Sequence, residues 1–274
     1  MKRLLGIALA MLVLATGCTP DEDVPSPPPS PGAVTTTPDP DQRWQPRVGA
    51  SFFVQYTGKV DFDRPVEVYN LDGERTTTED VQRLAARGVA AICYFNAGAF
   101  EDFRSDQDRF PKAVIGKPLD GWPGEHWLDI RQVDTLLPIM AARMDACRAK
   151  GFVAVDPDNT DGWTQETGFP LSPEDQIAYQ RALAREAHAR GLAIGLKNDP
   201  DQIDQMAGIV DFAVNEECVA YKECDKYAAF LAGGKAVFNI EYAGNRDKVC
   251  AERPAGMSTV IANRGLSGRI TGCP

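Results

Sequence analysis

Short apolar runs recur along the chain from residue 50 onward, and each gives way to a polar turn or to a stretch with helical periodicity. Runs of this length that are bounded by turn residues are typical of buried β-strands. The pattern predicts eight strands, over residues 51–55, 66–70, 89–95, 152–155, 193–196, 212–214, 236–240 and 259–262.

Three segments between these runs have the spacing of amphipathic helices, which we predict over residues 78–87, 135–150 and 173–190. The second of them places its apolar residues on one face: Leu136, Ile139, Met140, Met144 and Cys147. A glycine follows each predicted helix, at Gly88, Gly151 and Gly191. We expect these glycines to adopt the left-handed conformation that ends a helix before the chain re-enters a sheet.

The repeated order of strand, helix, glycine and strand predicts a parallel sheet. Eight strands in about 220 residues predict an α/β fold in which that sheet closes into a (β/α)₈ TIM barrel, and an open α/β sheet is the alternative. We expect one such domain over residues 44–274, with residues 101–131 forming a long loop that walls a groove. No internal repeat at a fixed period is present.

The N-terminus has the features of an export signal. Lys2 and Arg3 precede an apolar run over residues 4–15 that is too short to span a bilayer, so residues 1–17 are predicted to be a signal peptide. The run ends in Ala-Thr-Gly-Cys, which resembles a bacterial lipobox with Cys18 as the lipidated residue. Residues 18–43 are rich in Pro, Ser and Thr and are predicted to be a tether. We expect an exported protein, either a membrane lipoprotein facing outward that contacts the membrane only through this anchor, or a secreted protein in which Cys18 is incidental.

Six further cysteines form an even set in an exported chain, which favours disulfides. Six cysteines allow 15 pairings, and sequence alone does not choose among them. The pairing we predict is Cys218–Cys224, which closes a small loop, with Cys250–Cys273 and Cys93–Cys147. A zinc site is the alternative, but no C-x-x-C pair is present and only His126 and His188 are available. We expect no metal and no other cofactor.

The formal net charge is −10, and loss of Lys2 and Arg3 with the signal peptide would make it two units more negative. An acidic balance disfavours nucleic acid as a partner. An acidic surface usually only aids solubility, but it would also attract a cationic polymer, which matters if the partner is a polysaccharide that carries positive charge. We expect the chain to act as a monomer.

Polar residues gather at the carboxyl ends of the predicted strands, the face where barrel enzymes place their active sites. A single Asp or Asn in such a place usually caps the next helix, so the argument depends on convergence. Six carboxylates meet there with Lys197 and Asn198 between them: Asp156, Asp158, Asp161, Glu216, Glu217 and Glu241. Because they repel one another, some must be hydrogen-bonded, protonated or shifted in pKa.

Several kinds of chemistry lack their motifs in this sequence. There is no G-x-S-x-G elbow, and neither histidine stands at a strand end, which disfavours acyl transfer. No G-x-x-x-x-G-K-[ST] or G-x-G-x-x-G follows a strand, which disfavours nucleotide chemistry. Two carboxylates across a groove remain, and these are the standard apparatus of glycoside hydrolysis.

Six ordered blocks carry a family resemblance: ICYFNAGAFEDFRSD at 92–106, IGKPLDGWPGEHWLDIR at 115–131, GFVAVDPDNTDGW at 151–163, GLKN at 195–198, DFAVNEEC at 211–218 and FNIEY at 238–242. From residue 51 to about residue 242 the chain resembles glycoside hydrolase family 114, the endo-α-1,4-polygalactosaminidases. The resemblance implies cleavage of α-1,4-linked galactosamine polymers, N-acetylated or not, by one Asp and one Glu. The two catalytic residues of the family match Asp158 in DPDN and Glu216 in NEEC. The resemblance also implies a retaining reaction, with Asp158 as nucleophile and Glu216 as general acid and then base.

The chain departs from the family pattern in two places. The first strand reads FFVQYTG where the family more often has WQWQLTG, and Glu217 stands where a Gln is expected. Because neighbours on a strand point to opposite faces, we expect only one of Glu216 and Glu217 to face the groove, and we favour Glu216.

Sugar recognition uses amides, carboxylates and aromatic rings. The predicted substrate-binding residues are Gln55, Asp72, Tyr94, Asp129, Asp156, Asn159, Lys197, Asn198, Glu217, Glu241 and Tyr242. Trp122 and Trp127 either stack on sugars or pack under the long loop. A barrel that binds sugar without cutting it, and a hydrolase or transglycosidase of another glycan, remain the alternatives.

Overall fold

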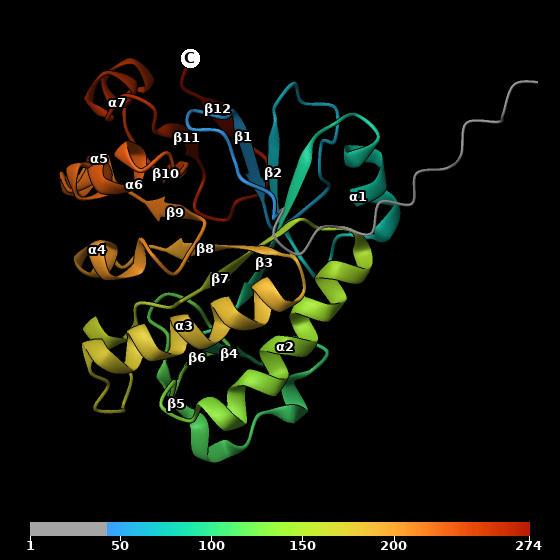
Figure 1. The fold of residues 1–274 in the computed structure, drawn as a ribbon, viewed down its shortest axis with the longest axis vertical. Coiled ribbons are helices and arrows are strands. Elements are labelled where there is room, and N and C mark those ends of the chain that lie inside the picture. Colours follow the sequence, from blue (N-terminus) through green and yellow to red (C-terminus); the bar gives the residue numbers. More distant parts are fainter. Residues whose placement is uncertain (1–42) are drawn as a thin grey trace, which may run out of the picture. The chain divides into compact units, whose positions relative to one another are not determined.

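The computed structural model describes residues 43–274, so the predicted signal peptide and the lipidation site Cys18 lie outside the described residues (Figure 1). Within these residues, eight parallel strands pair in sequence order: β1 (Phe52–Gln55), β2 (Val68–Asp72), β3 (Ala90–Asn96), β7 (Ala154–Asp158), β8 (Ala193–Lys197), β9 (Phe212–Glu216), β10 (Val237–Glu241) and β11 (Ser258–Ala262). Each overlaps a strand predicted from the apolar runs, and the ends differ by at most two residues except for β7, which ends three residues later than predicted.

The sheet curves round until its ends meet. A short strand that the sequence did not suggest, β12 (Ile270–Gly272), pairs antiparallel with β11, and β1 lies beside both. Ser258 Oγ donates to the Ala50 carbonyl at 2.7 Å, and Tyr56 N donates to the Leu266 carbonyl at 3.0 Å. The result is a nearly closed barrel, so the predicted fold class is confirmed and the open sheet is wrong.

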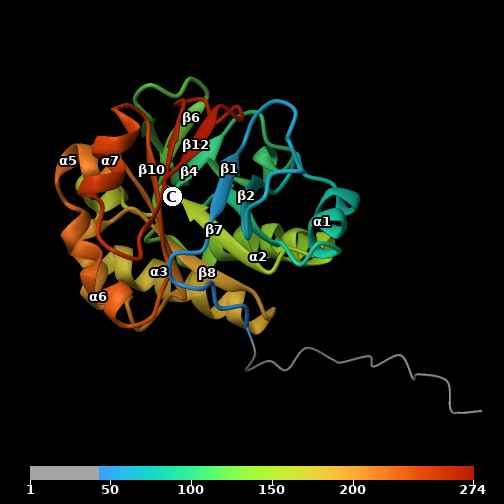
Figure 2. The ribbon, with the colours of Figure 1, turned by 90° about the horizontal axis from the view of Figure 1, so that it is seen from above.

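Helices surround the strands (Figure 2). They are α1 (Thr78–Ala85), α2 (Val133–Lys150), α3 (Pro173–Ala189), α4 (Ile203–Met206), α5 (Cys218–Tyr221), α6 (Ala228–Ala232) and α7 (Arg246–Glu252). The three predicted helices are confirmed, with ends that differ by one or two residues. The barrel is irregular, because residues 56–67 join β1 to β2 without a helix and α4 to α6 are only four or five residues long.

The three glycines that follow the long helices end them as predicted. Gly88, Gly151 and Gly191 have φ angles of 71°, 97° and 69°, a conformation that glycine adopts without a steric penalty. In each case the next residue donates its N–H to the carbonyl five positions back: Val89 to Leu84, Phe152 to Cys147 and Leu192 to Ala187, at 3.0 to 3.2 Å. These are Schellman turns, and each directs the chain into the next strand.

Between β3 and α2 the chain forms a second sheet, which we call the inserted sheet. Its strands are β4 (Ala99–Glu101), β5 (Ile115–Pro118) and β6 (Glu125–Leu128), paired antiparallel in the order β4-β6-β5. The prediction of a loop over residues 101–131 is therefore wrong for β5 and β6. These strands are four residues long and contain Gly116, Pro118 and charged residues, so no apolar alternation marks them.

Three disulfides are present in residues 43–274, with the predicted pairing. Cys93–Cys147 joins β3 to α2 across 54 positions, and the whole inserted sheet lies between its two cysteines. Cys218–Cys224 closes a six-residue separation at α5, and Cys250–Cys273 ties α7 to the segment after β12. Disulfides of this kind are consistent with an exported protein.

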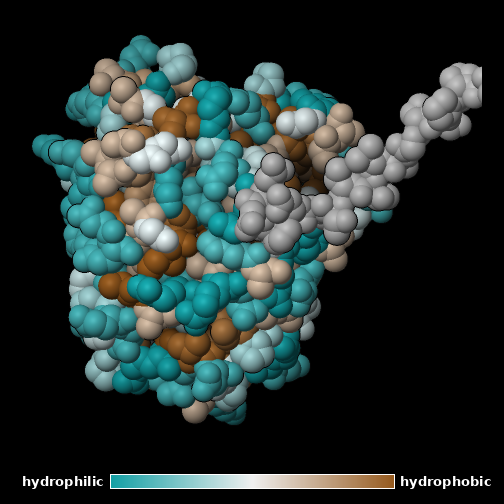
Figure 3. Space-filling model, viewed as in Figure 1, coloured by the Kyte–Doolittle hydropathy of each residue, from teal (hydrophilic) through white to brown (hydrophobic). Residues whose placement is uncertain are grey.

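Alternation along the strands separates two apolar layers. Phe52 and Val54 belong to the cluster inside the barrel, whereas Phe53 between them packs in the larger cluster under the helices. Ile92, Ala154, Phe212 and Phe238 also fill the interior. Hydrophilic residues cover most of the face seen in Figure 3. In the described part of the chain, every helix is too short or too polar to cross a bilayer.

Candidate active site

The alternation that fills the barrel interior also aims polar side chains at one end of it. Continuing in steps of two from inward apolar positions leads to Tyr94 on β3, Asp158 on β7, Lys197 on β8, Glu216 on β9 and Tyr242 after β10. All of them stand at the carboxyl ends of parallel strands. Because those ends meet at one mouth of a barrel, side chains from five separate segments come together there.

A cavity of about 380 Å³ occupies this mouth. Of the predicted site residues, its lining includes Tyr94, Asp158, Asn159, Asn198, Glu216, Glu217 and Tyr242. It also includes residues that were not among the predicted contacts: Tyr56, Asp120, Glu125, Asp161 and Arg264. The groove expected from the sequence is therefore present, and it is acidic.

Asp158 is held by three donors. Lys197 Nζ lies 2.9 Å from Oδ1, Tyr94 OH donates to Oδ2 at 2.7 Å, and the N–H of Asn159 donates to Oδ1 at 2.8 Å. Burial alone would raise the pKa of Asp158, but the charge of Lys197 and these hydrogen bonds lower it below its usual value. The lowered pKa favours the ionised form of Asp158 at neutral pH.

Lys197 is 1% exposed and lies between the two carboxylates, with Nζ 3.7 Å from Glu216 Oε1. Burial alone would lower the pKa of this lysine, but the surrounding charges of Asp158, Glu216 and Asp156 raise it well above its usual value. One lysine that stays charged thus partly neutralises several carboxylates at the barrel mouth.

Glu216 is oriented by its neighbours on both sides. Tyr242 OH donates to Oε1, and Asn198 Nδ2 donates to Oε2 at 3.4 Å. The Asn198 side chain also accepts from the N–H of Glu216 at 2.9 Å, so the amide fixes backbone and carboxylate together. Asn198 has a φ of 52°, in the left-handed region that Asn tolerates better than most residues.

Glu217 also lines the cavity, contrary to the expectation from strand alternation. The strand ends at Glu216, and the backbone of Glu217 adopts a left-handed conformation with a φ of 62°. Because Glu217 is no longer part of the strand, the alternation of side chains does not determine its direction, and it can line the same cavity as Glu216. Its carboxylate lies 3.3 Å from Arg264 Nη2, which neutralises it. Glu216 forms no ion pair with an arginine in residues 43–274, and it shares Lys197 with Asp158.

Asp156 lies beneath the cavity and is fully buried. It accepts from Asn70 Nδ2 at 2.7 Å and from Tyr56 OH at 3.3 Å. Burial raises its pKa to about 6, against the lowering charge of Lys197. This placement supports the residues above it and does not allow the predicted direct contact with a substrate.

Four other predicted contacts lie outside the cavity. Gln55 faces outward like Phe53 and donates to the carbonyls of the β1–β2 connection, and Glu241 faces outward to accept from the N–H groups of α5 at 2.9 and 3.3 Å. Asp129 is bound by Arg131, at 2.7 and 2.9 Å. The placement of all three is structural, and Asp72 belongs to the network described next.

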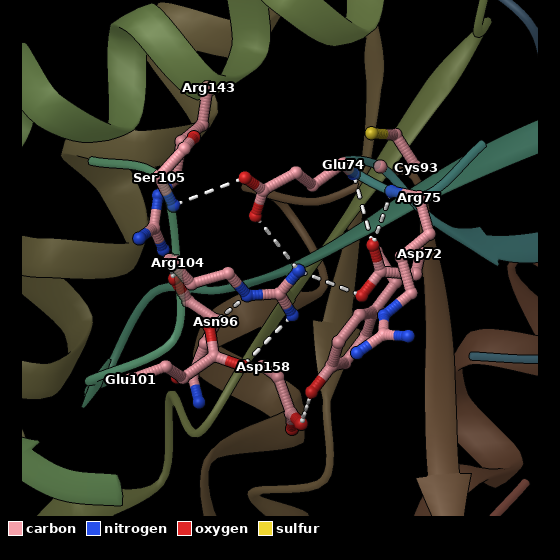
Figure 4. A network of polar contacts seen from close by, with 12 residues as sticks. Asp72, Glu74, Arg75, Cys93, Asn96, Glu101, Arg104, Ser105, Arg143 and Asp158 are labelled. Carbon is pink, nitrogen blue, oxygen red and sulfur yellow. Dashed lines mark hydrogen bonds and ion pairs between the residues drawn. The ribbon is translucent and has the colours of Figure 1, made fainter. Parts of the chain in front are cut away.

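Arg104 is the centre of a buried ionic network that joins the inserted sheet to the barrel (Figure 4). It binds Glu101 through two hydrogen bonds of 2.7 and 2.9 Å and Asp72 through one of 2.8 Å. Glu101 is on β4 and Asp72 ends β2. Burial alone would lower the pKa of Arg104, but Glu101 and Asp72 raise it, so the guanidinium stays charged and pins the two sheets together.

Aromatic residues complete the cavity wall. The rings of Tyr56 and Tyr94 stack with centroids 3.8 Å apart. Trp122 is 51% exposed at the rim, whereas Trp127 is 8% exposed and packs with Ala99 and Leu119. Tyr56 could have been found from the sequence, since it continues the inward series of Phe52 and Val54. Among residues 43–274, no three His, Cys, Asp or Glu side chains are grouped as metal ligands.

A TIM barrel with paired carboxylates across an acidic groove defines a glycoside hydrolase. The family model for glycoside-hydrolase family GH114 matches residues 33–274, and the chain belongs to this family. The chain is similar to Aspergillus fumigatus Ega3, solved as a complex with galactosamine: the identity is 36%, the TM-score 0.80, and the match covers 84% of this chain and 97% of Ega3.

The glycoside hydrolase domain of PelA from Pseudomonas aeruginosa has the same fold. Its identity to this chain is 15% and the TM-score is 0.64, with 81% of this chain and 97% of that domain covered. No curated protein sequence is significantly similar to the chain. The resemblance that the motifs suggested is thereby confirmed, and the chain is a glycoside hydrolase.

Proposed function

We propose that this enzyme is an endo-acting hydrolase of α-1,4-linked galactosamine polymers that uses Asp158 as nucleophile and Glu216 as acid and base. The observation that carries the proposal is the position of Lys197, which contacts both carboxylates from inside the barrel. Asp158, whose pKa is held low, suits attack on the anomeric carbon. Glu216, held by Tyr242 and Asn198, suits proton transfer.

In the first step a carboxylate oxygen of Asp158 forms a bond to the anomeric carbon while the glycosidic C–O bond breaks. Glu216 gives its proton to the departing sugar oxygen. In the second step Glu216 takes a proton from water, which attacks the anomeric carbon and releases Asp158. Lys197 and Tyr94 keep the attacking carboxylate ionised and oriented until the substrate arrives.

The spacing of the two carboxylates favours retention. Asp158 Oδ1 and Glu216 Oε1 can be no further apart than the sum of their distances to Lys197 Nζ, 2.9 and 3.7 Å. That limit falls at the bottom of the range for inverting enzymes, about 6.5 to 9.5 Å, and above the value of about 5 to 5.5 Å for retaining ones. Room for a separate attacking water between them is therefore small.

The galactosamine bound in Ega3, together with the acidic lining of the cavity, supports a substrate with free amino groups. Asp161 also lines the cavity, and burial with the charges of Asp158 and Asp199 raises its pKa to about 7, so a nearby ammonium group would favour its ionised form. Binding of a polycation to such a surface weakens as salt rises, because counter-ions screen it. An apparent affinity for deacetylated polymer that does not fall with ionic strength would contradict this substrate.

The decisive experiment is digestion of N-acetylated and deacetylated α-1,4-galactosamine polymer, followed by mass spectrometry of the oligomers. Asp158→Asn and Glu216→Gln should each lower turnover by about a thousandfold or more while binding persists. Glu217→Gln, which removes a carboxylate already neutralised by Arg264, should lower it less than about tenfold. Binding without products in the wild type would favour a non-catalytic barrel, and products from another glycan alone would overturn the substrate.

Proton NMR of the first product decides the stereochemistry, since a retaining enzyme releases the α-anomer before mutarotation. We also propose export with a lipid anchor at Cys18, which the three disulfides support only as far as export. Incorporation of labelled fatty acid into the wild type but not into Cys18→Ser is the expected result, and a soluble, unlabelled wild type would contradict the anchor.

A further inference from the structure

The turn that joins β5 to β6 brings a carboxylate and an exposed indole to the active-site cavity. Glu125 and Trp122 both line it, and they are linked by a hydrogen bond of 3.1 Å from the N–H of Glu125 to the carbonyl of Trp122. Trp122 is one of few large apolar side chains that are more than half exposed in the described residues, at 51%. An aromatic face and a carboxylate side by side have the two chemistries that an amino sugar presents, an apolar ring face and an ammonium group.

Glu125 stands in an unfavourable place for a carboxylate without a ligand. In the register of β4 and β6 it lies directly opposite Glu101, and like charges in such a pair destabilise a sheet. Arg104 neutralises Glu101 through two hydrogen bonds. Glu125 forms no ion pair with any Lys, Arg or His in residues 43–274, so the repulsion is relieved on one side only.

The carboxylate of Glu125 is nevertheless held in position. Asn96, which is fully buried, donates from Nδ2 to Glu125 Oε2 at 3.2 Å, and its own Oδ1 accepts from the N–H of Ala99 at 2.8 Å. Asn96 is the register partner of Asp158 across β3 and β7. A rigid amide thus fixes Glu125 next to the nucleophile and leaves Oε1 without a hydrogen bond in this part of the chain.

Resting on the proposed function, we propose that Glu125 and Trp122 form an amino-sugar subsite, in which Glu125 binds the 2-ammonium group and Trp122 stacks on the sugar ring. The inserted sheet thereby determines that the enzyme prefers deacetylated units. Burial, followed by the charges of Glu101 and Asp158, raises the pKa of Glu125 to about 7, and a bound ammonium group supplies the missing positive charge.

The test compares the ratio of kcat/KM on deacetylated polymer to kcat/KM on fully N-acetylated polymer. Glu125→Gln should lower this ratio about tenfold, as expected for loss of one half-buried charge pair, with the effect mainly in KM. Glu125→Asp, which keeps the charge, should recover part of the ratio. Glu79→Gln removes an exposed carboxylate of α1 that does not line the cavity, and it is the matched control with an unchanged ratio.

Trp122→Ala should raise KM about threefold to tenfold on both polymers, because stacking does not depend on acetylation. Phe103→Ala removes an equally exposed ring, 53% exposed, that does not line the cavity, and it should leave KM unchanged. A Glu125→Gln enzyme with the wild-type ratio, or with equal losses on both polymers, would overturn the subsite.

Two further readouts keep the outcomes separate. A wild type that cleaves neither polymer overturns the proposed function, whereas a wild type that cleaves and is unaffected at Glu125 overturns only the subsite. Thermal unfolding distinguishes a structural role, since removal of the Glu101–Glu125 repulsion should leave the Tm of Glu125→Gln equal to or above that of the wild type. A lower Tm together with equal losses on both polymers would assign Glu125 to folding.

Discussion

The barrel mouth and the inserted sheet both bury more carboxylates than cations, but the cation contacts the carboxylates in a different way in each. At the mouth Lys197, a compact charge, contacts one oxygen of Asp158 and one of Glu216, and the neutral donors Tyr94 and Asn198 hold the other oxygens. In the inserted sheet the planar guanidinium of Arg104 binds both oxygens of Glu101 and one of Asp72. The carboxylates bound by the guanidinium join two sheets, while those that share Lys197 line the cavity.

The strongest test of this contrast is Lys197→Met. Without the cation, the pKa of Asp158 rises, because burial is then opposed only by the hydrogen bonds from Tyr94 and Asn159. We expect kcat/KM at neutral pH to fall about a thousandfold, equal to about 4 kcal/mol, and the acid limb of its pH profile to move to higher pH. An acid limb that stays in place would show that Lys197 does not keep the nucleophile ionised.

Arg104→Met tests the other side of the comparison. It leaves Glu101 and Asp72 buried without their cation, and breaking such a network costs about 3 kcal/mol in the free energy of unfolding. Arg83→Met is the control, since Arg83 forms an exposed pair with Asp63 that contributes less than about 1 kcal/mol. Denaturant unfolding measures both, and equal losses in the two variants would contradict a structural role for the buried fork.

Two disulfides close loops of different length, and only Cys93–Cys147 encloses the inserted sheet. The chain-entropy account predicts that removing Cys93–Cys147, which spans 54 positions, costs about 4 kcal/mol, and that removing Cys218–Cys224, which spans six, costs about 2. We expect paired Cys→Ser variants to differ by about that amount in free energy of unfolding. Only the first should also reduce the preference for deacetylated polymer, because it releases the inserted sheet.

The smallest effect concerns pH. Since the pKa of Glu125 is raised to about 7 in the folded protein, the folded state keeps a proton that the unfolded state loses above about pH 4. Protonation of Glu125 therefore contributes to the free energy of unfolding at low pH, and this contribution is lost as pH rises through 7. Glu125→Gln should be more stable than the wild type at pH 8 and equal to it near pH 4, because the glutamine does not ionise. Unfolding curves at both pH values check the sign.

The barrel could be predicted because its strands depend on local patterns, whereas the assignment of Asp158 and Glu216 as the catalytic pair came from the family resemblance and stays a prediction. Apolar runs predict the strands. A polar residue two positions after an inward-facing apolar residue, at the carboxyl end of a strand, is expected to point into the barrel mouth. Two predicted contacts outside the cavity reflect neglect of this parity: Gln55 and Glu241 face outward, whereas their neighbours Tyr56 and Tyr242 line the cavity.

The inserted sheet could not be predicted in the same way. Its strands are short and polar, and they exist because β6 pairs with β4 and β5 at once. The opposition of Glu101 and Glu125 depends on that register, and the role of Asp72 depends on Arg104, 32 positions away. Such contacts are made by tertiary structure, and no local periodicity encodes them.

The Cys93–Cys147 bond closes the base of the segment that contains β4, β5 and β6, while Arg104 fastens the segment to the end of β2. A module attached in this way can be exchanged between relatives as one piece, with its two cysteines as the boundaries. The barrel would keep the bond-breaking chemistry, and the module would supply the choice of polymer. If the inserted sheet carries the amino-sugar subsite proposed above, substitutions within this one continuous stretch of the gene would be enough to change the preference between the two polymers.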